Sequence, residues 1–578
     1  FCVEYASRIR NTYHSACIWE GSIIMKIALI SMEVVPGHPD RNAAAMRAKI
    51  AEAKAAGAEL VLFPALSLSG LFLGGVWKQP AFLRDCAAYA EEIAAAAEGV
   101  TVVFGNAAQA DSCTGVCRTL VEARDGVLTE VMRTPLHGTG NHFAPLLYEL
   151  PGENIILAAD ASPFPICFGA STLAETARKK SKAICYINTL GLQDKGKTVY
   201  AFPGRAQVFS ANGERVLISP AYQEGITLVD TEQMPAPLPQ TAEAPIAPIH
   251  RMLRYAVQKF LARIRMERVV IGISGGIDSA VAAALYVDAI GAENVLLVNM
   301  PSRFNSATTK GLAAQLAENL GCRHTIVPIE ESVAHTVTQL TEVPIMGKAA
   351  AKGEHLTISS FVRENMQARD RSGRVLATVA AAWGAGFTCN ANKAESTVGY
   401  ATLYGDQAGF LSALADLWKY QVYDLARYLN DTVYGREVIP QGIIDIVPSA
   451  ELSDAQNVDE GKGDPIRYLY HDYLFRAFAE ENCIPEDILT HYTDGDLEKF
   501  IGCANGLVAE YFPTAADFIS DLERWWGLYT GMAVAKRIQS PPLLSVSGRA
   551  YGSDHPESQI GAYETIRYRA LKEKLLGN

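Results

Sequence analysis

The chain has 578 residues, of which 49% are hydrophobic and 20% are charged, and its formal net charge is −12. This length exceeds what one hydrophobic core usually supports, so we expect two domains of roughly 250 to 300 residues each. The acidic balance disfavours a nucleic acid as the main partner, and no apolar run approaches the roughly 18 residues of a membrane helix.

The first 24 residues differ in composition from the rest of the chain. They contain Arg8, Arg10 and Trp19 but no continuous apolar stretch of the kind found in a secretory signal. A clean apolar run begins just after Met25. We therefore expect residues 1–24 to be an unstructured extension and Met25 to be the biological start. The 11 cysteines are scattered along the chain, which favours free thiols in a reducing cytoplasm.

Residues 25–230 alternate between apolar runs and alanine-rich stretches, which predicts a layered α/β domain. The apolar runs predict strands, and the alanine-rich stretches predict helices. The expected strands are 26–31, 59–63, 101–105 and 183–188, and the clearest expected helices are 42–56 and 85–97.

Three short segments of this half carry candidate chemistry: 60–70, with Phe63-Pro64-Ala65; 133–137, which begins with Arg133; and 165–169, with Cys167. Together they resemble the nitrilase-like glutaminase family, which implies an α/β sandwich fold. The resemblance places Cys167 at the nucleophile position. It also places Ala65 where that family has its general base Glu, and Arg133 where it has its catalytic Lys.

The substitutions at Ala65 and Arg133 remove most of the expected hydrolytic chemistry. A cysteine nucleophile needs a nearby carboxylate that accepts its proton and a cation that stabilises the oxyanion. Arginine is bulkier and planar and does not replace lysine freely, and loss of a general base costs roughly 10² to 10⁴ in rate. We therefore expect this domain not to hydrolyse glutamine usefully. An alternative alignment with Glu59 or Glu52 as the base would leave it active.

Residues 231–249 contain five prolines among Ala, Gln and Glu, a composition that favours an extended linker. Residues 250–578 then form the second expected domain. Strands are predicted at 268–273, 294–299 and 324–329, and helices at 279–289 and 306–320. The second domain is therefore also expected to be layered α/β.

The first of these strands ends in Ser274-Gly275-Gly276-Ile277-Asp278-Ser279 and runs straight into a helix. The glycines let the backbone approach an anion, and the serine hydroxyls and helix N-terminus offer donors to a phosphate. The lysine of a Walker A loop is missing. Asp278 would repel a phosphate unless a divalent cation such as Mg²⁺ lies between them. The pattern resembles the pyrophosphate loop of ATP pyrophosphatases.

Further along the chain, polar residues follow the second strand at 300–306, and the ends of neighbouring parallel strands form one site. Asn365 and Arg369 stand four residues apart on one helical face. That spacing suits a ligand with ring nitrogens, hydroxyls or phosphate.

The segments 389–395 and 399–406, followed by Lys419 and by Pro448–Leu452, complete the pattern. Five motifs in this order over residues 250–555 resemble the NAD synthetase family. The resemblance implies a doubly wound parallel sheet of the adenine nucleotide alpha hydrolase type. It implies ATP-dependent adenylation of nicotinic acid adenine dinucleotide, attack by ammonia, and release of NAD, AMP and pyrophosphate. It also implies a homodimer or larger homo-oligomer.

The resemblance assigns roles to individual residues. The loop residues Ser274, Gly275, Gly276 and Ser279 would hold the pyrophosphate, while Asp278 and Glu395 would bind Mg²⁺. Lys419 and Ser449 would stabilise the α-phosphate, and Arg303 would be a further phosphate contact. Asn365, Arg369, Asn392, Lys393 and Thr402 would hold the dinucleotide, Asp406 would lie near the nicotinate and the ammonia, and Lys536 and Arg537 would close over the site.

Three alternatives remain. The chain could be an active glutamine-dependent NAD synthetase. It could be another ATP pyrophosphatase amidotransferase of the GMP-synthetase or asparagine-synthetase kind, although these would lack the segments 363–371 and 392–395. It could also be a non-catalytic scaffold. The presence of all four residues Asp278, Glu395, Lys419 and Ser449 argues against this alternative. Because its first domain lacks the base and the lysine, we expect ammonia rather than glutamine as the nitrogen donor.

Overall fold

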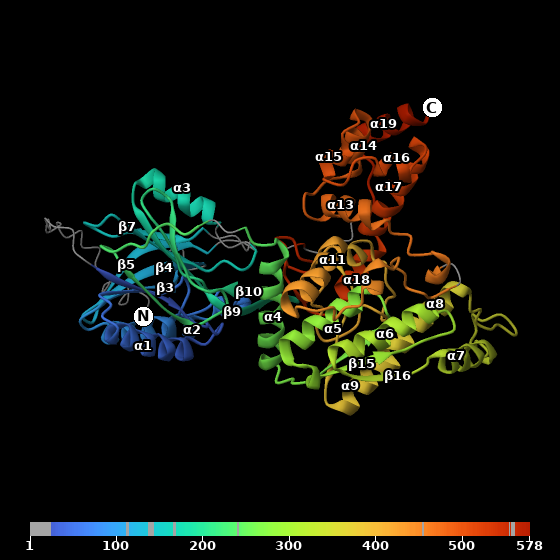
Figure 1. Ribbon diagram of the computed structural model, residues 1–578, viewed down its shortest axis with the longest axis horizontal. Coiled ribbons are helices and arrows are strands. Elements are labelled where there is room, and N and C mark those ends of the chain that lie inside the picture. The colour runs from blue at the N-terminus through green and yellow to red at the C-terminus, as the bar shows by residue number, and fades with distance from the viewer. Residues whose placement is uncertain are drawn as a thin grey trace. The chain divides into compact units, whose positions relative to one another are not determined.

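The computed structural model describes residues 25–110, 115–136, 144–165, 169–239, 242–453, 456–553, 555 and 561–577. The chain divides into two compact units (Figure 1). The change of unit falls between Glu243 and Ala244, and the short segment Gly196–Val199 belongs to the second unit. The extension expected at residues 1–24 and the predicted nucleophile Cys167 lie outside the described residues.

The first unit contains a six-stranded sheet and a five-stranded sheet. The first has the order β13-β1-β2-β3-β4-β5 and the second has the order β12-β11-β8-β7-β6. The strands of the first sheet are β1 (Lys26–Ser31), β2 (Leu60–Leu62), β3 (Thr101–Gln109), β4 (Val116–Arg124), β5 (Val127–Pro135) and β13 (Gly225–Asp230). Those of the second are β6 (Leu146–Glu149), β7 (Ile155–Asp160), β8 (Ala183–Asn188), β11 (Gln207–Phe209) and β12 (Arg215–Ile218).

Strand alternation explains how this unit builds two apolar layers from one sheet. Side chains point alternately to opposite faces of a strand. On β1, Ile27 and Leu29 belong to the cluster shared by the two sheets, whereas Ala28 and Ile30 belong to the cluster shared with the helices. Those helices are α1 (Pro39–Ala55) and α2 (Pro80–Ala96), which lie side by side in Figure 1. On the second sheet, α3 (Ala170–Lys180) contributes Leu173 to a further cluster. The expected α/β sandwich is confirmed.

The two long helices of this unit begin earlier than the alanine-rich runs predict. Each has a proline in its first turn, at Pro39 and Pro80. Proline is well suited to this position because the first-turn N–H groups have no partner within the helix. The same reason explains why α4 (Ile246–Arg263), with Pro248 in its first turn, begins inside the segment 231–249 that was expected to be all linker.

Two further elements lie in this part of the chain. A hairpin is formed by β9 (Leu190–Lys195) and β10 (Thr198–Pro203), and a 3₁₀ helix covers Gly74–Lys78.

The second unit is built on a parallel sheet of order β16-β15-β14-β17. Its strands are β14 (Val269–Ile273), β15 (Val295–Asn299), β16 (Arg323–Ile326) and β17 (Gly386–Phe387). The chain runs from β14 outward to β15 and β16 and then returns to place β17 on the other side of β14. The direction of winding therefore reverses beside β14. In parallel sheets, ligands bind at the carboxyl ends of the strands at such a reversal.

Helices cover both faces of this sheet, as a doubly wound fold requires. On one face lie α5 (Ile277–Ile290) and α6 (Ala307–Leu320), which Figure 1 shows beside β15 and β16. The other face packs Val270 and Val298 against the cluster formed with α7 (Glu330–Glu342), the π-helical turn η3 (Asp370–Leu376) and α9 (Ala377–Trp383). Helices nearer the site are α8 (Ser360–Arg369), α10 (Lys393–Val398), α11 (Lys419–Tyr428) and α12 (Gln441–Asp445). The predicted doubly wound sheet is confirmed.

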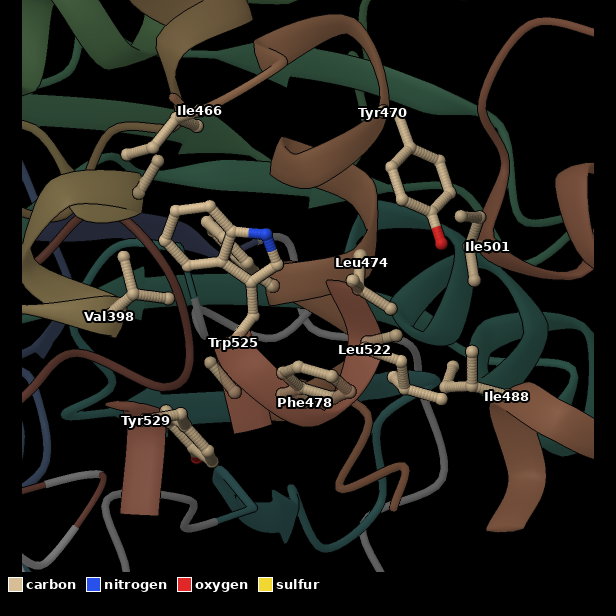
Figure 2. Close-up of a cluster of buried hydrophobic side chains, with 14 of the residues drawn as sticks. Val398, Ile466, Tyr470, Leu474, Phe478, Ile488, Ile501, Leu522, Trp525 and Tyr529 are labelled. Atoms are coloured by element: carbon tan, nitrogen blue, oxygen red, sulfur yellow. The ribbon is translucent and has the colours of Figure 1, made fainter. Parts of the chain in front are cut away.

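The last part of the chain adds a mainly helical layer around Trp525. Figure 2 shows this indole surrounded by Val398, Ile466, Leu474 and Phe478. Since Val398 belongs to α10, the helical layer packs directly on an element of the site. The helices are α13 (Tyr468–Ala479), α14 (Pro485–Asp494), α15 (Leu497–Ile501), α16 (Leu507–Tyr511), α17 (Ala515–Thr530), α18 (Met532–Gln539) and α19 (Ile566–Leu576), and β18 covers Leu543–Leu544. None of the helices described is both long enough and apolar enough to cross a bilayer.

Candidate active site

The loop between β14 and α5 forms the floor of a cavity of about 280 Å³. Gly275 has a φ of +88°, and a Cβ there would lie 2.2 Å from the carbonyl oxygen of Thr309, so no other residue fits without displacing backbone. The Ser279 hydroxyl donates to the Gly276 carbonyl at 3.0 Å, and the Ser274 hydroxyl accepts from the Gly276 N–H at 3.2 Å. The loop thus has a fixed shape at a helix N-terminus, which suits an anion.

Two carboxylates and one ammonium group meet beside this loop. Lys419 Nζ lies 2.5 Å from Asp278 Oδ2 and 3.9 Å from Glu395 Oε1, and all three residues line the cavity. Burial and the neighbouring Asp278 raise the pKa of Glu395 to about 8. Burial by itself would lower the pKa of Lys419, but the two carboxylates raise it above its ordinary value. Lys419 is therefore protonated and lies between the acidic side chains of Asp278 and Glu395.

Helix α10 begins with a capping box that positions this group. The Asn392 side chain accepts from the Glu395 N–H at 3.1 Å, and the Glu395 carboxylate accepts from the Asn392 N–H at 3.3 Å. Asn392 Nδ2 also donates to Asp278 at 3.1 Å. Asn392 is fully buried and outside the cavity lining. Asn392, which was predicted to contact the substrate, therefore links Asp278 and Glu395 to each other.

Lys393 also differs from the expectation that it contacts the dinucleotide. It is fully buried, and its Nζ lies 2.7 Å from carboxylate oxygens of both Asp416 and Glu480. Nearby carboxylates raise its pKa although burial opposes this. Its ammonium group is held within the protein, because a charge buried this deeply needs such partners. The structure thus places Lys393 in the framework behind the site.

Asp406, which the resemblance assigns to the neighbourhood of the nicotinate, lies in the cavity wall. Its carboxylate accepts from the Thr402 N–H at 2.7 Å, and burial raises its pKa. Thr402 in turn donates to Asn365 at 2.9 Å, and Arg369 donates to the Leu403 carbonyl at 3.1 Å. The structure therefore gathers Asn365, Arg369 and Thr402 around the loop of Asp406, although these three do not line the cavity.

The remaining predicted phosphate contacts are placed differently from one another. Ser449 lines the cavity, but its hydroxyl donates to the Gln456 carbonyl at 2.7 Å. Arg303 does not line it, and its guanidinium lies 4.7 Å from the centre of the Phe304 ring. Arg537 is buried and donates to the carbonyl oxygens of Thr397 and Tyr529, so it supports the fold and does not close over the site. Lys536 donates to the Gly399 carbonyl at 2.7 Å.

The cavity also contains charged residues that were not predicted as site residues. Arg371 donates to the Met300 carbonyl and to Asn305, both at 3.1 Å, and burial lowers its pKa to about 10. Asp464 accepts from the Tyr400 hydroxyl at 2.9 Å. Arg371 lies two residues beyond the predicted Arg369, so the local signal was present. Nothing local marked Asp464, which reaches the site through tertiary packing.

In the first unit, Ala65 is fully buried in the apolar layer between the two sheets. Its N–H donates to the carbonyl of Asp160, at the end of β7, at 3.2 Å. The Asp160 carboxylate accepts from Ser162 and Tyr186, both at 2.7 Å. Arg133 donates twice to the Glu130 carboxylate, at 2.6 and 2.8 Å. The Asp160 carboxylate is therefore engaged with hydroxyl groups, and the charge of Arg133 is paired.

Comparison with known proteins agrees with both halves of the architecture. Residues 249–500 match the family model for NAD synthase. The chain is 29% identical to the glutamine-dependent NAD(+) synthetase of Xylella fastidiosa over 94% of this chain and 99% of that one. It shares its fold with two solved glutamine-dependent NAD+ synthetases. That of Acinetobacter baumannii, in complex with ADP, has a TM-score of 0.62 at 23% identity over 93% of this chain and 98% of that one. That of Cytophaga hutchinsonii has a TM-score of 0.72 at 15% identity over 96% of this chain and 100% of that one.

Proposed function

We propose that this chain is an NAD synthetase, a carbon–nitrogen ligase that converts nicotinic acid adenine dinucleotide to NAD at the expense of ATP. The observation that supports this best is the convergence of Asp278, Glu395 and Lys419 on a glycine loop at the carboxyl edge of the parallel sheet. The family match over residues 249–500 covers all of these residues.

The proposed reaction begins at the nicotinate carboxylate. Its oxygen attacks the α-phosphorus of ATP, the bond to the β-phosphate breaks, and pyrophosphate leaves toward the loop at Ser274–Ser279. Ammonia then attacks the acyl-adenylate carbon, AMP leaves, and a proton is lost to give the amide. In this proposal, Lys419 stabilises the charge that develops on the α-phosphate. Asp406, in the cavity wall, holds ammonium and accepts its proton.

Magnesium fits this site as a partner of the nucleotide. Among the residues the structure describes, no group of three or more Asp, Glu, His or Cys side chains is arranged to hold a metal ion. Asp278 and Glu395, however, are close enough for one carboxylate to raise the pKa of the other. Mg²⁺ is commonly bound by one or two carboxylates together with substrate phosphates. The ion would neutralise charge on the phosphates during the displacement.

The reaction products test this proposal. Purified chain with Mg²⁺, ATP, ammonium chloride and nicotinic acid adenine dinucleotide should yield NAD, AMP and pyrophosphate in equal amounts. Formation of ADP, or AMP release that needs a different acceptor acid, would overturn it. The second of these results would instead favour another ATP pyrophosphatase amidotransferase. An intact nucleotide would favour a scaffold.

The nitrogen donor has two candidates. The names of the relatives favour glutamine, and the matches to them extend over both units. The first unit favours ammonia, because Ala65 has no carboxylate and Arg133 is paired with Glu130. Comparing initial rates of NAD formation with glutamine and with ammonium chloride at saturation decides between them. Comparable rates would establish the glutamine-dependent enzyme and exclude a degenerate first unit.

Two further expectations belong to this proposal. A homodimer or larger homo-oligomer is proposed with the family resemblance, and light scattering of the purified chain tests it. A cytoplasmic location is supported by the free state of Cys86, Cys117, Cys185, Cys322, Cys389, Cys483 and Cys503.

A further inference from the structure

The segment Pro448–Leu452, here called the strap, forms one wall of the cavity. Its Glu451 is 3% exposed and accepts three hydrogen bonds from residues that follow β15. The donors are Asn305 Nδ2 at 3.1 Å, the Ser306 N–H at 3.1 Å and the Thr309 hydroxyl at 2.8 Å. All three belong to a stretch more than 140 residues earlier in the chain. A single carboxylate thus fastens the strap to the start of α6.

The backbone of Glu451 indicates that these bonds determine its conformation. Its φ is +45°, in the left-handed region that side chains with a Cβ rarely adopt. A residue persists in such a conformation only where its surroundings over-determine it. Here the donors Asn305, Ser306 and Thr309 hold Glu451 in this conformation. Arg371 supports them, because it donates to the same Asn305 side chain at 3.1 Å.

Thr309 connects this carboxylate to the pyrophosphate loop. Gly275 packs so closely on the Thr309 carbonyl that a Cβ would lie 2.2 Å from it. On the other side, the Glu451 N–H donates to the Ser449 hydroxyl at 3.2 Å. The loop, Thr309, Glu451 and Ser449 therefore form a continuous series of contacts across the cavity. A shift at Glu451 would move the two walls relative to each other.

We propose that Glu451 is a positioning residue that holds the strap, with Ser449, at a set distance from the pyrophosphate loop and so determines the affinity for the ATP phosphates. The inference rests on the proposed function of the cavity. Glu451 lines the cavity, but three protein donors occupy its carboxylate, so we assign it no direct role in holding the nucleotide. Its effect passes through Thr309 and Ser449.

The variant Glu451→Gln tests this inference on the full chain. Glutamine keeps the size of the side chain but turns an N–H₂ group toward groups that are themselves donors. Hydrogen bonds to charged groups contribute enough that losing one changes an equilibrium by roughly tenfold. We expect the KM for ATP to rise by at least about tenfold. The KM for the dinucleotide acid should stay unchanged, and kcat should fall by less than about threefold. Glu460→Gln is the matched control, since this carboxylate is exposed and paired with Lys462.

A second variant keeps the inference testable if Glu451→Gln fails to fold. Thr309→Val removes the hydroxyl donor but keeps the branched side chain and the backbone beneath Gly275. It should raise the KM for ATP by about threefold or more, and the two substitutions together should be less than additive. An unchanged KM for ATP in folded variants would overturn the inference. So would equal increases for both substrates. In either case an active wild type would leave the proposed function standing, whereas an inactive wild type would contradict the proposed function itself.

Discussion

The cavity beside β14 in the second unit and the surroundings of Ala65 in the first unit differ sharply in polarity. Beside β14, Asp278 pairs with Lys419 in a buried cavity, and the Glu395 carboxyl, whose pKa burial and Asp278 raise to about 8, lies 3.9 Å from the same ammonium group. In the first unit, Ala65 follows β2 and is packed among apolar side chains, and the charge of Arg133 on β5 is paired with Glu130. Burying charge is costly unless it is paired and hydrogen-bonded, so a site retains it only where something maintains the arrangement. The comparison shows that the second unit holds a buried group of charged side chains beside a cavity, whereas the surroundings of Ala65 in the first unit are apolar.

The largest expected effect on activity comes from a substitution in the charged cavity of the second unit. Asp278→Asn removes a carboxylate that pairs with Lys419 and, by our proposal, binds Mg²⁺. We expect the rate of pyrophosphate release to fall by at least about 10³-fold, since both the ion and the lysine lose their partner. The exposed Asp424 on α11, substituted in the same way, is the control. A rate near that of the wild type would show that Asp278 does not hold the metal.

The second prediction concerns the first unit. If Ala65 and Arg133 are what prevents glutamine hydrolysis, Ala65→Glu with Arg133→Lys should raise glutamine-supported NAD formation by about tenfold or more. The rate with ammonium chloride should not change. The ratio of the two rates is the measurement, and each single variant is a control because the base and the cation act together. A wild-type ratio already near one would remove the contrast between the two units.

A third, smaller effect tests how much the backbone shape of the glycine loop, as distinct from the charged side chains, contributes to ATP binding. Gly275→Ala forces a Cβ against the Thr309 carbonyl at a left-handed φ. We expect the KM for ATP to rise about tenfold, with some loss of stability. Gly321→Ala is the control, because its φ is +69° and nothing lies within 4 Å of the added Cβ. If both variants lose the same stability and neither changes the KM for ATP, the close packing of the loop is not what shapes the site.

The smallest effect is on stability and depends on pH. Burial raises the pKa of Asp472 from 3.8 to about 7, so the folded chain favours the protonated acid. The stability that this preference contributes is present below about pH 4 and is lost as pH rises toward 7. Asp472→Asn should therefore be more stable relative to the wild type at pH 8 than at pH 5. The difference in Tm between the two proteins at each pH measures this, and a difference independent of pH would contradict it.

Much of the architecture followed from local patterns. Each predicted strand and helix depends on apolar spacing within a few residues, and β1, β3 and β8 begin where the pattern places them. Helix starts were less accurate, since α1 and α2 begin at Pro39 and Pro80, before the alanine-rich runs, and α4 includes Pro248, in a segment expected to be linker. The reason is physical: proline is unfavourable within a helix but well suited to its first turn.

By itself the sequence determined the glycine loop, its aspartate and the absence of a carboxylate at Ala65, because each depends on residue type at one position. Only the tertiary structure decided which neighbours face the cavity. Glu395 lines it while Lys393, two residues earlier on the same short helix, is buried behind it. Successive helical side chains point in different directions, so packing selects the face that meets a ligand. Glu451 and Asp464 join the site for the same reason, since folding brings together segments that no local pattern relates.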